Sequence, residues 1–243
     1  TKLTNIEIPD SLTTIESEAL SGCSALTSIT IPDSVTTIGD SAFYSCSKIT
    51  EITIPYGVTN IGYNTFYNCS SLTSVTIPEG VTTIGFEAFS GCSSLTEIIL
   101  PANLTDIGAG AFSGCSGLTS VTIPDKITRI NYDTCSYCSH LTSVTIPEGV
   151  TTIDEYAFRD CTALSSIEIP ASVNSIGQFS FYSCNSLSEI KVNENNTVYS
   201  SIDGVLFDKN GTTLIKLPAN SYYLEYTIPY GTTSIAAYAF TDS

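Results

Sequence analysis

Cysteine is the residue type whose number and spacing most invite a chemical role in this sequence. The chain has 9 cysteines in 243 residues, a content that in a secreted protein normally indicates disulfides. If one cysteine occupies the same place in each turn of a repeat, the Cα–Cβ bonds run parallel instead of converging, which disfavours disulfides. We therefore predict a ladder of buried free thiols that act as small apolar side chains. Its members follow one another at steps of 23 residues: Cys23, Cys46, Cys69, Cys92, Cys115, Cys138, Cys161 and Cys184.

The ninth cysteine creates a C-x-x-C motif between Cys135 and Cys138. By its letters this motif suggests a redox pair or half of a zinc site. The chain has no second C-x-x-C and a single histidine, His140, so it does not offer four zinc ligands. We interpret Cys138 as a member of the ladder and Cys135 as a substitute for a core phenylalanine, and we expect no metal site and no cofactor.

Histidine and carboxylates could carry acid–base chemistry. The neighbours of His140 in the sequence include no carboxylate suited to orient it, which argues against a histidine-activated nucleophile. A two-carboxylate hydrolase stays open on letters alone, although we expect no catalytic residues. Acidic residues recur after the proline of the repeat; solvated turns are one interpretation and weak calcium binding is the other. These residues are Asp10, Asp33, Glu79, Asp125 and Glu148.

All of these residues are positioned by one internal repeat. The unit beginning at Leu72 reads LTSVTIPEGVTTIGFEAFSGCSS, and its leucine, proline, phenylalanine and cysteine positions recur at the same 23-residue step. A unit this small cannot bury its own core, so each must be one coil of a solenoid. We predict a β-rich α/β solenoid: a right-handed superhelix of short parallel strands, each coil closed by a short helical or 3-10 turn, with the glycine after isoleucine marking a tight bend.

The pattern L-x-x-[IV]-x-I-P-x-x-V-x-x-I-G-x-x-A-F-x-x-C resembles the BspA-like class of bacterial leucine-rich repeats. The resemblance covers Leu3 to about Val192 and resumes from Tyr226 to Phe240. It implies a leucine-rich-repeat fold and a protein associated with adhesion to host matrix proteins such as fibronectin and fibrinogen, and with co-aggregation of cells. Departures are local: Asn131 and Asp154 replace the glycine, Thr65, Thr134 and Ser180 replace the alanine, and Cys135 replaces the phenylalanine.

The repeat is interrupted near the C-terminal end. Asn193 stands where proline is due, and Asn210-Gly211 separates two apolar runs, which is a strong hairpin signal. We predict three parts: regular repeats in 1–192, an irregular insertion with a β-hairpin in 193–225, and a resumed, truncated repeat in 226–243. The insertion is interpreted as a stabilising elaboration, with a dedicated binding loop as the alternative.

Composition limits the class of partner. The formal net charge of −16 argues against nucleic-acid binding and against a polybasic membrane surface. No apolar run approaches the roughly 18 residues of a membrane-spanning helix. The chain has no methionine and begins in mid-pattern, so we expect a processed or excised segment of an extracellular or cell-surface protein, without its signal or anchor.

Exposed aromatic residues are the best candidates for recognition. Core positions of a repeat stay constant, so aromatic residues at its variable positions can anchor a protein or carbohydrate partner, while packing of the outer shell is the alternative. We expect a non-catalytic scaffold that binds an extracellular protein, with self-stacking through uncapped ends as the alternative function. The candidate binding residues are Tyr44, Tyr56, Tyr63, Tyr67 and Phe86.

Overall fold

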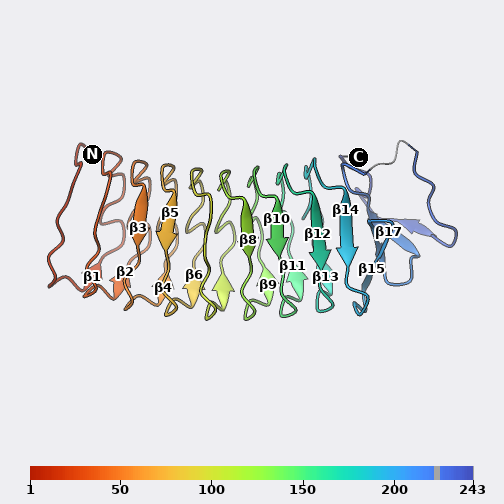
Figure 1. Cartoon of the computed structure of the whole chain (residues 1–243), viewed down its shortest axis with the longest axis horizontal. Coiled ribbons are helices and arrows are strands. Elements are labelled where there is room, and N and C mark those ends of the chain that lie inside the picture. Colours follow the sequence, from red (N-terminus) through yellow and green to blue (C-terminus); the bar gives the residue numbers. More distant parts are fainter. Residues whose placement is uncertain (222–224, 243) are drawn as a thin grey trace.

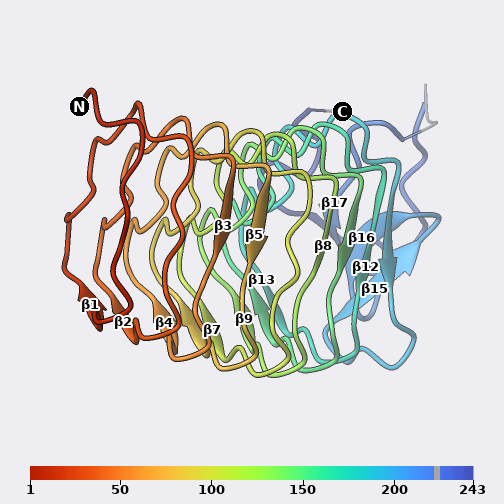
Figure 2. The same ribbon diagram turned by 60° about the vertical axis from the view of Figure 1, so that its left-hand side comes forward.

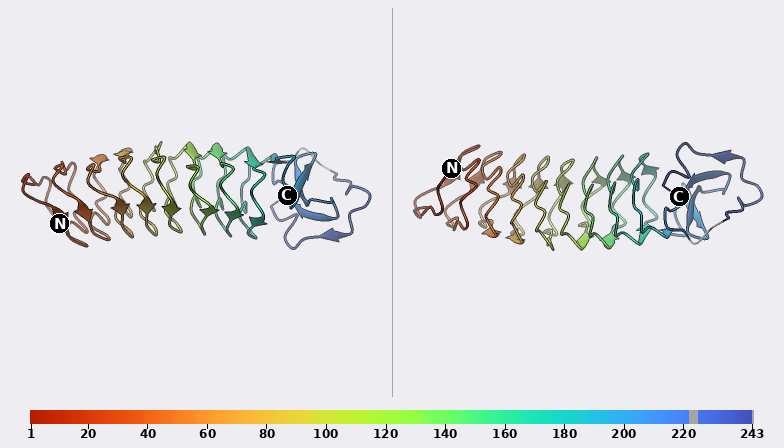
Figure 3. Two further views of the ribbon diagram at one scale, coloured as in Figure 1. Left: turned by 90° about the horizontal axis from the view of Figure 1, so that it is seen from below. Right: turned by 90° about the horizontal axis from the view of Figure 1, so that it is seen from above.

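The fold was obtained as a computed structural model that describes residues 1–221 and 225–242. These residues form an elongated stack of coils, followed by a small sheet at the C-terminal end (Figures 1 and 3). In Figure 1 the chain descends along the near side and rises along the far side as it advances from the N-terminus, which makes the solenoid right-handed. Figure 2 shows the coils as closed loops lying one behind another.

The strands of the regular coils lie in two rows, although some coils contribute a strand to only one of them. Pairing is parallel, and partners lie 23 residues apart, as in Glu51 with Ser74 and Thr83 with Asp106. The first row, whose arrows point down in Figure 1, contains β3 (Glu51–Thr53), β5 (Ser74–Thr76), β8 (Ser120–Thr122), β10 (Ser143–Thr145), β12 (Ser166–Ile169) and β14 (Glu189–Val192). The second row contains β1 (Thr14–Ile15), β2 (Thr37–Ile38), β4 (Asn60–Ile61), β6 (Thr83–Ile84), β7 (Asp106–Ile107), β9 (Arg129–Ile130), β11 (Thr152–Ile153) and β13 (Ser175–Ile176).

The core consists of identical side chains stacked along the long axis. The rings of Phe43, Phe66, Phe89 and Phe112 are buried and stack on one another with centroids 5.2–5.9 Å apart. Leucine, isoleucine and cysteine positions form further buried rows. Each coil therefore buries its apolar side chains against its two neighbours, which is the nearest-neighbour stabilisation of a repeat protein.

The predicted helical turns, and with them the α/β class, are wrong. Among the described residues the segment between the glycine and the cysteine of each coil is a chain of turns. In one coil Ala42, Tyr44 and Cys46 donate their N–H groups to carbonyls three residues earlier, while Ser41, Phe43 and Ser45 donate to the next coil. Ser41 and Ser45 have φ of 56° and 54°. A left-handed residue at every fourth position cannot belong to a right-handed helix.

Close packing of coils, not a tight bend, explains the repeated glycine. The backbone of Gly108 does not have a left-handed φ, yet a Cβ on it would lie 2.5 Å from the carbonyl carbon of Gly85. Asn131 and Asp154 hold the same place. The side-chain Nδ2 of Asn131 donates to the carbonyl of Ile107. The N–H of Asp154 donates to the carbonyl of Ile130, as the N–H of Gly108 does to that of Ile84, and the carboxylate of Asp154 also accepts from Arg129.

The repeat pattern gives way to a four-stranded sheet at the C-terminal end. β15 (Tyr199–Ile202), β16 (Val205–Asp208) and β17 (Thr213–Lys216) are antiparallel, and β18 (Ser234–Ile235) returns parallel to β17. Asn210-Gly211 lies in the connection between β16 and β17. A second, smaller core lies under this sheet and consists of Val205, Phe207, Leu214, Leu217 and Ala239.

Two polar side chains join the regular coils to this sheet. The amide of Asn196 is fully buried: Nδ2 donates to the carbonyls of Pro170 and Val173, and Oδ1 accepts from the N–H groups of Val198 and Tyr199. The hydroxyl of Tyr199 accepts a hydrogen bond from the N–H of Ile176 in β13. Side chains thus satisfy backbone groups that a further regular coil would otherwise pair.

Candidate interaction surfaces

Eight of the cysteine side chains form one row inside the stack, and Cys135 lies at the phenylalanine position. All nine cysteines are buried and free. In the row, the Sγ of Cys69 donates to the carbonyl of Phe43 at 3.2 Å, and the Sγ of Cys92 donates to that of Phe66 at 3.2 Å. The same carbonyl of Phe43 also accepts the N–H of Cys46. From Cys46 to Cys184, each thiol of the row therefore bridges two coils, and its role is packing.

Burial suppresses ionisation of these thiols. It raises the pKa of Cys46 to about 11 and that of Cys184 to about 12, and the pKa of Cys115 well above its ordinary value. For Cys138 the largest cause of the raised pKa is its hydrogen bond with the Cys135 thiol, followed by burial. Thiolate is the nucleophile and the metal ligand, so the C-x-x-C lies in surroundings that oppose either chemistry.

The single histidine and two of the repeated carboxylates form hydrogen bonds with the backbone of neighbouring coils. His140 is exposed, and its Nδ1 lies 2.7 Å from the carbonyl of Ser116. Two of the post-proline carboxylates accept hydrogen bonds from the next coil: Glu79 from the N–H of Ala102, and Glu148 from that of Ala171. Within the described chain, no three His, Cys, Asp or Glu side chains are arranged to hold a metal ion. No helix among residues 1–221 and 225–242 is long and apolar enough to cross a membrane.

Four of the five predicted binding residues lie on the turn segments of three neighbouring coils. Tyr44 and Tyr67 are half-buried and stack with centroids 4.9 Å apart and planes within 5°. Tyr63 and Phe86 are 60% and 45% exposed at equivalent positions of adjacent coils. These four residues are called the N-terminal aromatic patch below. Tyr56 is exposed too, but it lies in the post-proline turn between the two strand rows, away from this patch.

A second aromatic cluster, which the sequence reasoning missed, lies on the turn segments of the last regular coils. Phe179 stacks on Tyr156 with centroids 5.5 Å apart and contacts Tyr182 and Tyr238 edge-on or tilted. The guanidinium of Arg159 lies over the rings of Tyr137, Tyr156 and Tyr182 at 5.1, 5.3 and 5.9 Å. The sequence spacing could have predicted this cluster, because Tyr156 and Phe179 are 23 residues apart, as are Arg159 and Tyr182, and so lie at equivalent positions of adjacent coils. The small residues Ala109, Gly110 and Ser113 lie between the two clusters.

Comparison with solved structures gives bacterial leucine-rich-repeat proteins. A leucine-rich cell surface protein from Faecalibacterium prausnitzii is 40% identical over 86% of this chain, with a TM-score of 0.77. A T. pallidum leucine-rich-repeat protein is 28% identical over 72% of the chain (TM-score 0.59), and the pneumococcal vaccine antigen PcpA is 26% identical over 98% (TM-score 0.54). The chain spans 56%, 72% and 51% of the length of these three proteins.

The repeat itself matches a described family. The profile of the BspA type leucine rich repeat region aligns with residues 1–119 and 105–243, in six copies. No curated protein sequence matches the chain significantly. Together with the 23-residue register and the stacked core, this match shows that the chain belongs to the BspA-type leucine-rich-repeat family.

Proposed function

We propose that the chain is a non-catalytic scaffold that binds an extracellular protein partner through the N-terminal aromatic patch. The observation that carries the proposal is the exposure of Tyr63 and Phe86 on the same run of turn segments as the stacked Tyr44 and Tyr67. Aromatic side chains anchored on a rigid scaffold are typical of the energetic centre of protein interfaces. The strand rows, by contrast, expose mainly threonine and serine, which offer few such anchors.

The location and the kind of partner belong to the same proposal. The Faecalibacterium protein is a cell surface protein, and PcpA is a vaccine antigen. Both descriptions support display of this chain on a bacterial surface. Adhesion to a host matrix protein or to a neighbouring cell follows as the proposed role, and a scaffold without enzymatic activity fits the packing roles of its cysteines, histidine and repeated carboxylates.

The test is a binding assay in which the two more exposed residues of the patch are replaced. The double variant Tyr63→Ser and Phe86→Ser changes two exposed side chains, so the solenoid should keep its unfolding temperature. We expect at least a tenfold loss of binding to immobilised matrix proteins, fibronectin and fibrinogen among them. The control is Tyr56→Ser, an exposed tyrosine outside the patch. Equal binding by the wild type and the folded double variant would remove this patch from the proposal.

A second candidate function is end-to-end self-association. It is favoured by Ile235 and Phe240, which are 50% and 39% exposed in the last described coil although isoleucine and phenylalanine are buried in regular coils. Light scattering after size-exclusion chromatography, repeated with Ile235→Ser, tests it. A wild-type mass that rises with concentration and falls to that of a monomer in the variant supports stacking; a constant monomer rejects it.

A further inference from the structure

The aromatic cluster near the C-terminal end lines an open pocket in the surface. The pocket has a volume of about 360 Å³ and is named the junction pocket here; its lining residues are Tyr156, Arg159, Phe179, Tyr182, Tyr238 and Thr241. Its walls come from the last regular coils and from the segment that follows β18. The volume falls within the range of small-ligand sites, about 300–1,000 Å³.

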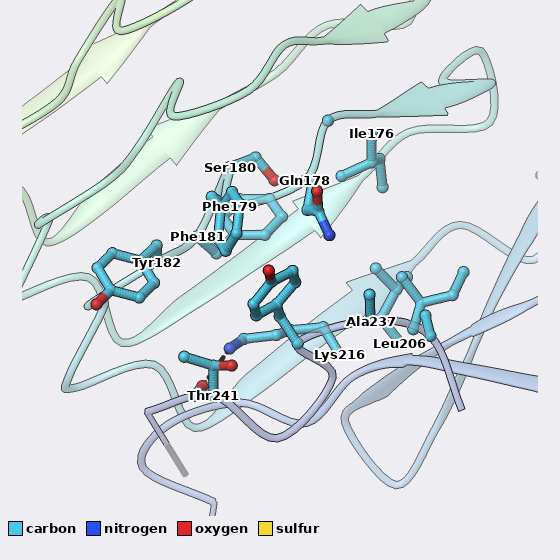
Figure 4. Close-up of a pocket in the computed structure, with 14 residues that line it drawn as sticks. Ile176, Gln178, Phe179, Ser180, Phe181, Tyr182, Leu206, Lys216, Ala237 and Thr241 are labelled. Atoms are coloured by element: carbon cyan, nitrogen blue, oxygen red, sulfur yellow. Dashed lines mark hydrogen bonds between the residues drawn. The ribbon is translucent and has the colours of Figure 1, made fainter.

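A second depression adjoins the junction pocket. It has a volume of about 240 Å³ and shares Phe179, Tyr182, Tyr238 and Thr241 with it. Figure 4 shows this part, with Lys216 and Thr241 on one side and Phe179, Phe181 and Ile176 on the other. The Nζ of Lys216 donates to the carbonyl of Thr241 at 2.5 Å, so this cation is held against the wall.

The rings of the junction pocket are fixed before any ligand arrives. Phe179 is packed between Tyr156, at an interplanar angle of 8°, and Tyr238, at 54°, while Tyr182 meets it at 88°. The guanidinium of Arg159 is held both by tyrosine rings and by an ion pair with Asp160 at 3.0 Å. A site whose side chains are already ordered loses little conformational entropy on binding.

The charges around the pocket indicate what class of ligand it suits. Arg159 is paired with Asp160 and also interacts with Asp133, and Lys216 interacts with Asp242. Glu155 is a further carboxylate of the same coil and interacts with Tyr132. Three carboxylates thus interact with the two cations, in a chain of net charge −16. A phosphate, sulfate or carboxylate would meet no excess positive charge here.

We propose that the junction pocket binds a neutral saccharide. A sugar ring presents a face of C–H groups, which carry partial positive charge, and an aromatic face such as that of Tyr238, a residue that is 57% exposed, carries partial negative charge. The hydroxyl groups at the edge of the ring need both donors and acceptors, and Arg159 and the tyrosine hydroxyls supply them. The proposal uses residues outside the N-terminal aromatic patch, so it is independent of the protein-binding function.

The experiment titrates the folded chain with neutral di- to tetrasaccharides of glucose, galactose, mannose and N-acetylglucosamine, with sialylated and sulfated saccharides as comparison. Binding is followed by saturation-transfer NMR and calorimetry. We expect at least one neutral saccharide to bind, and Tyr238→Ala and Arg159→Gln each to weaken it at least tenfold. Tyr182→Phe, which removes only a hydroxyl group, should weaken it less.

Two control variants separate this site from the rest of the molecule. Tyr230→Ala removes an exposed tyrosine outside the pocket, and Tyr63→Ala removes one from the N-terminal aromatic patch; both should leave saccharide binding unchanged. No binding to any neutral saccharide, a preference for the anionic ones, or equal binding by Tyr238→Ala and wild type at equal unfolding temperature would overturn the proposal. So would a protein partner whose binding depends on Tyr238 while no neutral saccharide binds.

Discussion

At the residue scale, equivalent positions of different coils make equivalent contacts, and the residues that replace the usual type show which contacts the position requires. Cysteine supplies a small apolar group whose S–H reaches the carbonyl of the preceding coil, as Cys92 does with Phe66. Where threonine replaces the buried alanine, its hydroxyl donates to a carbonyl three residues earlier, Thr65 to Gly62 and Thr134 to Asn131. A buried polar group is tolerated at these positions because its hydrogen bond is made inside its own turn.

The buried thiols predict that the free energy of unfolding falls at alkaline pH. The folded pKa of Cys46, about 11, is above its ordinary value of 9.0, so this thiol contributes stability that is complete below pH 9 and is lost as pH rises through about 11. The loss amounts to about 1.4 kcal/mol for each unit of pKa difference. Urea unfolding at several alkaline pH values, with thiolate absorbance as a second readout, measures it. A midpoint that falls equally in Cys46→Ala and wild type would contradict this assignment.

The same row predicts unreactive thiols in the native protein. Because the side chains are buried and neutral, a thiol reagent at neutral pH should modify the folded chain slowly and should modify all 9 cysteines once it is unfolded without reductant. Mass spectrometry of the two samples counts the adducts. Fewer adducts in the unfolded, unreduced sample would show that disulfides exist and that the free-thiol ladder is wrong.

At the element scale, the coil is a closed loop whose turns depend on its neighbours. Ser41, Glu87, Asp133 and Tyr156 all hold left-handed φ values between 51° and 58°, although among these residue types only aspartate adopts this region with any ease. Their cost is offset by hydrogen bonds to the next coil, such as that of Glu87 N–H with the carbonyl of Ala109. Because residues of such different types occupy this position, the sequence did not reveal its left-handed conformation.

Because the coils approach closely at the repeated glycine, we predict that adding one methyl group there lowers the free energy of unfolding. In Gly108→Ala the new Cβ would meet backbone atoms of the preceding coil at 2.5 Å, and we expect destabilisation of about 1–3 kcal/mol. Gly80→Ala is the matched control, since its nearest neighbour would lie at an ordinary 3.4 Å. Chemical denaturation of both variants compares them. Equal unfolding midpoints would show that the coils can separate freely and that the glycine is not required by packing.

The junction between the regular coils and the C-terminal sheet depends on Asn196. Asn196→Ala would leave two carbonyls and two N–H groups without their partner, and we expect a loss of about 3 kcal/mol in unfolding free energy. Hydrogen exchange should rise first in β13 and β15 and spread less to β3. The exposed neighbour Asn195→Ala serves as control; if it is as destabilising as Asn196→Ala, the buried amide is not the cause.

At the scale of the whole molecule, the repeat determines the fold, and departures from the repeat determine where recognition can occur. The 23-residue step predicted parallel strands and a stacked core because each unit alone is too small to bury its apolar residues. The N-terminal aromatic patch followed from comparing Tyr63 with Phe86. The junction pocket did not, because Tyr238 comes after the interruption, where the 23-residue step no longer shows which residues are neighbours. The division into 1–192, 193–225 and 226–243 stays a prediction. The sheet of β15 to β18 joins its second and third parts.

The central claim is that this solenoid acts by contact, through aromatic side chains on its turn segments. Hydrogen exchange of the chain with and without a captured partner, read by mass spectrometry, tests it most directly. We predict that binding protects peptides containing the turn segments around Tyr63 and Phe86 and leaves the strand rows of the same coils unchanged. Protection confined to β3 and β5, with those turn segments exchanging as fast as in the free chain, would contradict it.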